Sequence, residues 1–183
     1  MTLTPGEKLI LLMLSDVIDQ QKIKTDIDTK LVRAAIHSGN LWGLEWEMSG
    51  VFHGDETSKA IVEETVNFLN MWERLEQSYN NLPQADKDSL LNQVNLFSSG
   101  VVFPGFDGNN ESVYLTTAKF LIKDMGRFTH FEGRKDMNSH MPMVEAYRRM
   151  YAVFEPVLMH VSNQDFSAAQ VAQVLAAWRA PKP

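Results

Sequence analysis

Residues 61–82 read IVEETVNFLNMWERLEQSYNNL, and this stretch decides the fold. One row of mostly apolar residues recurs along it in alternating steps of four and three, at Ile61, Thr65, Phe68, Trp72, Leu75, Tyr79 and Leu82. This spacing is that of a heptad seam carried by one long α-helix. A second row, made by Val62, Val66 and Leu69, widens the apolar stripe. We therefore expect a helix that faces a globular core rather than a dimeric coiled coil.

The residues that flank this stretch mark its ends. Asp55 or Thr57 can cap its first turn, and Pro83 ends or kinks it because proline cannot donate to the helical ladder. Other stretches with helical periodicity lie at about residues 5–20, 31–38, 41–46, 90–97, 113–125, 142–155 and 167–178. The sequence therefore predicts an all-α fold of about seven to eight helices. We expect one domain over residues 1–183, with a possible subdivision near Pro83–Gly100.

Capping residues support several of these helices. Thr4 with Glu7 and Ser167 with Gln170 have the spacing of capping boxes. The crowded apolar residues of 9–18 predict a first helix that is buried over much of its circumference. Pro156 is expected to kink or end the helix that begins at about residue 142.

Two segments, residues 101–110 and 126–133, resist a helical interpretation because they combine turn-forming residues with aromatics. We expect them to be ordered loops that pack on each other. Their four rings, which are Phe103, Phe106, Phe128 and Phe131, would be costly to bury separately. Arg127 is predicted to pair with Asp107 or Glu111 inside this unit, and Asp107 or Asn109 to cap the helix that follows.

Composition and charge narrow the classes of function. The 183 residues include no cysteine, which excludes disulfides, thiolate nucleophiles and cysteine-bound metal clusters. The net charge of −6 and pI of about 5.3 argue against a nucleic-acid partner, since such domains present a basic surface. The longest apolar run, residues 9–14, is far shorter than the ~20 residues of a membrane span. We expect a cytoplasmic protein with no membrane partner.

Four common catalytic, metal-binding and nucleotide-binding motifs are missing from the sequence. It has no H-x-x-x-H pair, no G-x-S-x-G, no phosphate-binding loop and no dinucleotide fingerprint. We expect no cofactor and no metal ion, and we assign no catalytic residue. Candidates for chemistry are the polar residues of the two loops, namely Asp107, Glu111, Arg127, Thr129 and His130. A structural role for His130 is the more ordinary interpretation, although an imidazole near a carboxylate can also act as a general base.

Trp42 and Trp46 are candidates for an interface. They lie four residues apart, so they share one face of a helix. Burial in the core is the commoner fate of such a pair, and an aromatic anchor between subunits is the alternative. Four Trp, ten Phe and ten Met are difficult to bury in a chain of short helices. We therefore expect a homo-oligomer, most simply a two-fold dimer.

The central residues resemble the signature of the YfbU family of bacterial proteins. The resemblance rests on Phe103-Pro-Gly-Phe-Asp107, Glu111, Tyr114, Gly126-Arg-Phe-Thr-His-Phe131, Asn138, Pro142-Met143, Glu145, Tyr147, Arg149 and Met150. It covers nearly the whole chain and is most specific over residues 103–150. The sequence departs from the pattern in a longer connection around Lys135 and an extension past Ala177. The resemblance implies an all-helical cytoplasmic protein and carries over no catalytic residue.

Two hypotheses of function follow from these observations. The first is a non-enzymatic, self-associating interaction or regulatory protein, favoured by the missing catalytic motifs and the abundance of aromatic residues. The second is a small hydrolase or nuclease-like enzyme built around Arg127, Thr129 and His130, with Asp107 or Glu111 as its carboxylate. An open pocket that brings Asp107 to His130 would favour the enzyme, whereas backbone partners for both would disfavour it.

Overall fold

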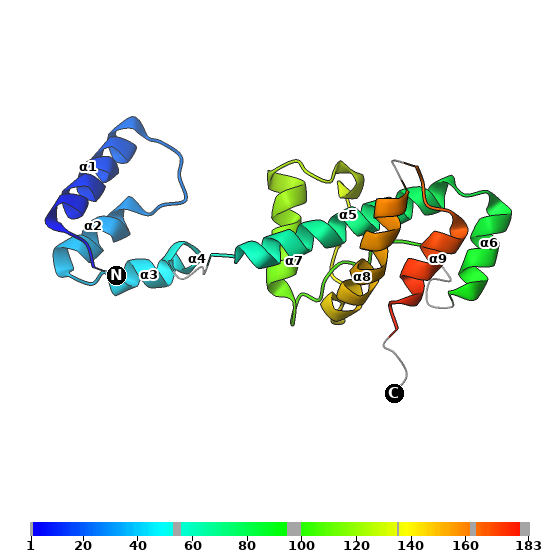
Figure 1. The fold of residues 1–183 in the computed structure, drawn as a ribbon. Coiled ribbons are helices and arrows are strands. Elements are labelled where there is room, and N and C mark those ends of the chain that lie inside the picture. The colour runs from blue at the N-terminus through cyan, green and yellow to red at the C-terminus, as the bar shows by residue number, and fades with distance from the viewer. Residues whose placement is uncertain (1, 53–55, 95–99, 135, 162–163, 180–183) are drawn as a thin grey trace. The chain divides into compact units, whose positions relative to one another are not determined.

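The computed structural model describes residues 2–52, 56–94, 100–134, 136–161 and 164–179. The chain divides into two compact units, Met1–Glu56 and Thr57–Pro183, and each is described by itself. In the described residues all regular structure is helical, apart from one isolated β-bridge between Phe106 and Asn138 (Figure 1). The predicted all-α class is confirmed. The possible subdivision near Pro83–Gly100 falls inside the second unit rather than between the two.

Four helices lie in the described residues of the first unit. They are α1 (Pro5–Gln21), α2 (Thr29–Ser38), α3 (Trp42–Glu47) and α4 (Ser49–Phe52). Thr4 forms the predicted capping box with Glu7, and Gly39 ends α2 in the left-handed conformation, as its sequence position predicts. α1 packs against α2, but Ser15 is its only buried residue. The prediction that α1 is buried over much of its circumference is therefore wrong, because α2 covers one side of it only.

The second unit is built around α5 (Lys59–Asn81), which packs against α7, α8 and α9 (Figure 1). Phe68, Trp72 and Leu75 of its seam are completely buried, so the predicted core-facing helix is confirmed. Its N-cap is Ser58, whose hydroxyl accepts from the Ile61 amide, rather than Thr57. Asp55, the other predicted cap, lies outside the described residues.

This unit has further helical segments besides α5. They are α6 (Gln84–Gln93), α7 (Ser112–Lys119), a π-helical turn η1 (Phe120–Asp124), a 3₁₀ turn η2 (Thr129–Phe131), α8 (Val144–His160) and α9 (Ala168–Ala176). Of these, α6 packs chiefly on α9. α6 begins directly after Pro83, six residues earlier than the periodicity predicts, because proline fits its N-cap position. Residues 95–97 of the predicted helix lie outside the described part.

Two predicted helix boundaries differ from those observed. α8 runs through Pro156 to His160, where we predicted that it kinks or ends. Ala152, whose carbonyl lacks a donor because Pro156 has no N–H, is exposed, so water can satisfy that carbonyl. The N-cap of α7 is Glu111, without a side-chain bond to its own helix, instead of Asp107 or Asn109. The predicted capping box of α9 is present.

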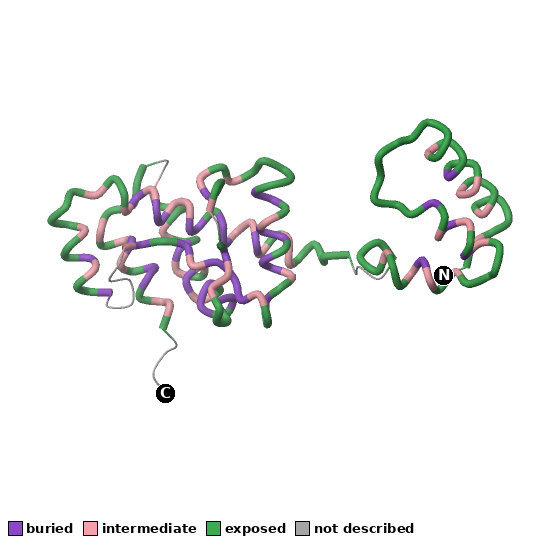
Figure 2. The backbone as a smooth tube through the Cα atoms, turned by 180° about the vertical axis from the view of Figure 1, so that it is seen from behind, coloured by how far each residue is buried: buried purple, intermediate pink, exposed green. Residues whose placement is uncertain are grey.

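An aromatic cluster forms the centre of the second unit. Phe103 lies 5.8 Å from both Trp72 and Tyr147, measured between ring centroids, and Phe106 lies 5.6 Å from Tyr147. Figure 2 shows that buried backbone concentrates in this unit, whereas most of the first unit is exposed. The second unit therefore has a core of its own, and the first unit has a small one, made by Val32, Ala35 and Leu44.

Candidate functional site

The two loops do pack on each other. The ring centroids of Phe103 and Phe131 are 5.4 Å apart, and both rings are buried with Phe106 in the same core. Phe128 is partly buried against that core. The Phe106 amide also donates to the Met137 carbonyl at 2.9 Å, which joins the first loop to the segment that follows the second. The predicted structural unit is therefore confirmed.

Gly105 makes this close backbone approach possible. It has a φ of +93°, and a Cβ atom at its position would lie 1.8 Å from the Met137 carbonyl oxygen. Its own carbonyl accepts a 2.7 Å hydrogen bond from the Tyr147 hydroxyl. Burial raises the pKa of Tyr147 well above its ordinary value, so this phenol remains a donor. Only glycine fits here, because other residues need both space and a negative φ.

The ion pair of this unit uses residues that differ from the predicted ones. Arg127 is exposed, and no ion pair among the described residues includes it. Arg134 instead donates to Glu76, a carboxylate on α5, at 2.9 Å from Nη1 and through a second, shorter bond from Nη2. The Glu76 carboxylate is also 2.6 Å from the His130 Nε2 atom and accepts from the Phe103 amide at 2.6 Å.

Glu76 is thus a charged group enclosed by donors. Only 3% of its surface is exposed, and burial on its own raises the pKa of Glu76. Hydrogen bonds from Arg134, the Phe103 amide and His130 favour the ionised form more strongly, and together they hold the pKa below its ordinary value. The arrangement ties α5 to both loops. Since its donors are all used in holding the loops, we interpret it as structural.

Glu111 and Asp107 also serve the backbone. Glu111 accepts from the amides of Met143 and Val144 at 2.6 and 2.7 Å, which satisfies the first turn of α8, and from the Asp107 amide at 3.0 Å. Asp107 accepts from the Asn109 amide at 3.0 Å and from the Asn110 side chain. The Asn110 side chain and the Asn109 amide hold the pKa of Asp107 below its ordinary value.

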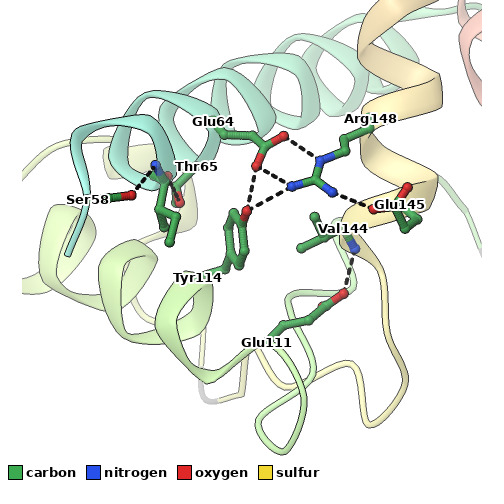
Figure 3. A network of polar contacts seen from close by, with 9 residues as sticks. Ser58, Glu64, Thr65, Glu111, Tyr114, Val144, Glu145 and Arg148 are labelled. Carbon is green, nitrogen blue, oxygen red and sulfur yellow. Dashed lines mark hydrogen bonds and ion pairs between the residues drawn. The ribbon is translucent and has the colours of Figure 1, made fainter. Parts of the chain in front are cut away.

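A second polar network joins α5, α7 and α8 nearer the surface (Figure 3). Arg148 donates to the Glu64 carboxylate at 2.6 and 2.9 Å and also bonds Glu145, while the Tyr114 hydroxyl donates to Glu64. The hydrogen bond from Arg148 is the main cause that lowers the pKa of Glu64. Burial first, and then Glu64, raises the pKa of Tyr114. The network connects α5, α7 and α8 through the side chains of Glu64, Tyr114 and Arg148.

The five predicted candidates for chemistry do not form one constellation. The Glu111 carboxylate accepts from backbone amides, the Asp107 carboxylate accepts from the Asn109 amide and the Asn110 side chain, and His130 bonds Glu76. Thr129 and Arg127 are exposed. Within the described ranges, no hydrogen bond or ion pair joins either carboxylate to Arg127, Thr129 or His130. In those same ranges, no group of three or more His, Asp or Glu residues is placed to hold a metal ion. The geometry gives no support to the hydrolase or nuclease-like alternative.

The first unit exposes much more apolar surface than its size would suggest. Among residues 2–52 and 56, eleven large apolar side chains are exposed: Leu9, Ile10, Met13, Leu14, Val17, Ile23, Ile27, Trp42, Trp46, Val51 and Phe52. Trp42 is 59% and Trp46 77% exposed, with their ring centroids 5.9 Å apart. The more ordinary interpretation of this pair, burial in the core, is therefore wrong. α3 is short, and Leu44 is its buried residue, so the side of the helix that carries Leu44 faces the core of the unit.

The family model of the YfbU domain matches residues 1–177, which is nearly the whole chain. The chain belongs to the YfbU family. The resemblance seen in residues 103–150 is thereby confirmed, and those residues are the ones that build the loop unit of this YfbU chain. Among its described residues, no helix is both long and apolar enough to cross a membrane.

Sequence reasoning missed Glu76 and Arg134. A signal for Glu76 was present, because it follows Leu69 by seven residues and so continues the second apolar row of α5. The row also contains Glu73, which is only partly buried, so the row alone does not show which carboxylate needs a buried partner. Arg134 gave no such signal, since nothing in the order of residues distinguishes it from Arg127, seven residues earlier.

Proposed function

We propose that this YfbU protein is a non-enzymatic, self-associating interaction or regulatory protein, and that its first unit forms the interface between two copies. The observation that carries the proposal is the outward face of α1. Five aliphatic or thioether side chains, between 44% and 59% exposed, make up this face: Leu9, Ile10, Met13, Leu14 and Val17.

These five positions form one continuous stripe. At about 100° per residue they fall within an arc of roughly 140° around the helix. Glu7 and Asp16 border the arc, and no charged residue lies inside it. The other side of α1, which includes Ser15 and Leu11, packs on the α2 side of the unit. α1 is therefore apolar on two sides, whereas a surface helix of a monomer is apolar on one.

The amount of apolar surface is sufficient for association. Full burial of one aliphatic side chain contributes about 1.5–3 kcal/mol, so completing the burial of five half-exposed ones contributes about 4–7 kcal/mol per copy. Contiguous exposed patches of this kind mark interaction sites in natural proteins. Trp42 and Trp46 add the aromatic area that is typical of interface anchors.

Charge does not oppose the contact of like copies. Arg33 on α2 pairs with Asp16 at 2.7 Å and also with Asp19, so Asp16, one of the two acidic residues at the border of the face, has a cationic partner within each copy. A two-fold dimer is the simplest assembly that such a self-complementary face supports. We propose the cytoplasm as the compartment, which fractionation of cells carrying a tagged full-length chain would test.

The test is a charge placed in the middle of the stripe. Met13→Asp leaves the isolated helix intact, since Met13 is exposed, but would place an unpaired charge inside the interface. Sedimentation velocity at micromolar concentration should give a dimer for the wild type and a monomer for this variant. Met141→Asp, at a similarly exposed methionine of the second unit, is the matched control and should remain dimeric. Equal association of both variants would refute the proposal.

A further inference from the structure

The tryptophan pair of α3 belongs to a row of residues that line one pocket. Trp42, Glu45, Trp46 and Ser49 follow one another in steps of three, one and three, which is the spacing of one helical face. Together they line an open pocket of about 460 Å³. Leu44, the buried residue of α3, lies about half a turn from either tryptophan. The pair therefore contributes little to the core of the unit and is placed to contact a ligand.

The two indole rings border the same volume. Their centroids are 5.9 Å apart, and their planes are inclined at 54° to each other. A cation is attracted to a ring face when it lies within about 6 Å of the ring centroid, and tryptophan attracts it most strongly. Because the centroids are this close, one cation can lie within that distance of both rings. The pair can thus bind a positively charged group with both rings at once.

Hydrogen bonds hold one of these rings in place. The Trp42 Nε1–H donates to the Asn40 Oδ1 atom at 3.1 Å, and the Asn40 Nδ2–H donates to the Ser38 Oγ atom at 3.0 Å. The Ser38 hydroxyl in turn donates to the Ala34 carbonyl of α2 at 2.7 Å. Because the indole N–H lies at the edge of the ring, this chain of bonds does not cover the ring face. Binding at that face therefore costs little side-chain freedom.

The charge around the pair favours a cation. Glu45 lies on the pocket wall, and among the described residues that wall contains neither lysine nor arginine. Residues 34–58 of the sequence also lack both, but include four carboxylates, at Glu45, Glu47, Asp55 and Glu56. A cation beside the rings gains from the nearby negative charge, whereas an anion is repelled by it. This complementarity of charge selects a cationic occupant.

The class of cation follows from the groups that the wall offers. They are two indole rings, whose polar group is a donor, one carboxylate and one hydroxyl. An ammonium or guanidinium group that is covered by a ring face loses hydrogen bonds to water and needs acceptors in return. A quaternary ammonium group has no N–H, so ring faces and negative charge are sufficient to bind it. The wall therefore suits a cation that is covered by methyl groups.

We propose that Trp42, Trp46 and Glu45 form a binding site for a small quaternary ammonium compound of the choline type. Ser49 lies on the same wall, where its hydroxyl can bond the hydroxyl of such a ligand. The site is complete within one copy of the chain. The inference goes beyond the proposed self-association, which rests on the face of α1, and either can fail without the other.

Titration of choline into the ¹⁵N-labelled full chain tests the site. The indole N–H signals of Trp42 and Trp46, assigned with Trp42→Phe and Trp46→Phe, should shift and saturate with a dissociation constant in about the millimolar range. The signals of Trp72 and Trp178, which lie in the second unit, should not move. Sodium chloride keeps the ionic strength constant, because salt screens exposed charges.

A neutral isostere of choline separates charge from shape. In 3,3-dimethylbutan-1-ol a carbon atom replaces the quaternary nitrogen, so the molecule has the shape of choline without its charge. It should bind at least about fivefold more weakly, because the attraction to the ring faces and to Glu45 requires the charge. Phosphocholine, which adds an anionic group, should also bind more weakly than choline, since the wall offers that group no basic partner.

Matched substitutions test the residues of the wall. Glu45→Gln removes the charge on the wall, keeps the shape of the side chain and should weaken choline binding about threefold. Glu47→Gln makes the same change at an exposed position of α3 outside the wall and should leave binding unchanged. Trp46→Leu replaces a ring by an aliphatic side chain at a position that is 77% exposed, so the fold is kept and binding should fall at least about fivefold.

The outcomes decide the assignment. Selective shifts of the two indole signals, with a preference for choline over the neutral alcohol and weaker binding by Glu45→Gln, support it. Equal binding of choline and the neutral alcohol overturns it, as does equal binding by Glu45→Gln and Glu47→Gln. Tighter binding of phosphocholine would assign the pair to a zwitterionic head group and overturn the assignment to a cation.

The Met13→Asp variant separates this inference from self-association. Choline binding by that variant that equals or exceeds wild-type binding supports a site within one copy, and weaker binding overturns it. A chain that binds choline but stays monomeric overturns self-association alone. A dimer whose indole signals do not respond to choline overturns the choline site alone.

Discussion

Replacing Glu76 by glutamine should strongly destabilise the second unit. Glu76→Gln keeps the shape of the side chain but removes the charge that Arg134 and His130 face, and it turns one acceptor oxygen into a donor. In either orientation the new amide nitrogen faces a donor of Arg134, together with the Phe103 amide in one orientation and with the His130 Nε2 atom in the other. The buried position leaves little water to replace the lost bonds.

The magnitude follows from these contacts. Removing one partner of a buried ion pair costs about 3–5 kcal/mol. Arg134 retains some access to water, with 24% of its side chain exposed, so we expect a loss of about 2–4 kcal/mol in the free energy of unfolding. In an Arg134→Met background the same change should cost at least ~1 kcal/mol less, because the guanidinium is no longer left unpaired.

Urea unfolding followed by tryptophan fluorescence measures this change. Trp42→Phe and Trp46→Phe in every variant restrict the signal to Trp72 and Trp178 of the second unit. The control is Glu63→Gln, the same substitution at an exposed position of α5, and surface pairs contribute ~0–1 kcal/mol. A loss of less than ~1 kcal/mol for Glu76→Gln, or equal losses with and without Arg134, would refute the assignment of Glu76 as a buried anchor of the loops.

Three further predictions concern the same unit. Gly105→Ala should cost more than ~4 kcal/mol of stability or prevent folding, because its Cβ would overlap the Met137 carbonyl. The control Gly133→Ala, with open space around the new Cβ, should cost ~1 kcal/mol. Thermal melts of the two variants measure the difference. Glu111→Gln should lower the free energy of unfolding by about 1–3 kcal/mol, because both carboxylate oxygens accept from backbone amides and the side-chain amide has only one acceptor oxygen. Urea unfolding curves that overlay the wild-type curve would contradict this. Because the folded protein holds the pKa of Glu76 below its ordinary value of about 4.3, its stabilisation is complete above that pH and is lost as the pH falls through the lower folded value. The urea midpoint should therefore fall more steeply below about pH 4 in the wild type than in Glu76→Gln, and parallel pH profiles would show that Glu76 contributes no such dependence.

Local rules predicted the framework of the fold. The seam of residues 61–82, the capping boxes at Thr4 and Ser167 and the left-handed Gly39 all depend on residues within one turn of each other. Such short-range signals can be read from sequence. The extent of α8 could not be predicted from the sequence, because tertiary packing and solvent access decide whether a helix continues through Pro156.

The contents of the loop unit were only partly predictable. Aromatic composition indicated that the two loops meet, and the rings of Phe103 and Phe131 do contact. The choice of Arg134 over Arg127 depends on which guanidinium reaches α5 after the chain folds, and that is a long-range property. Burial of the first helix was overestimated for a related reason, since apolar periodicity predicts an apolar face but not the partner that covers it.

Self-association through the first unit is the central claim, and the molar mass of the full chain in solution tests it most directly. Sedimentation equilibrium over a range of micromolar concentrations should give twice the chain mass of 20.8 kDa at the upper end, with dissociation on dilution. Because the contact is apolar, raising the salt from 0.1 to 0.5 M should not weaken it. A mass of 20.8 kDa at every concentration would contradict the account.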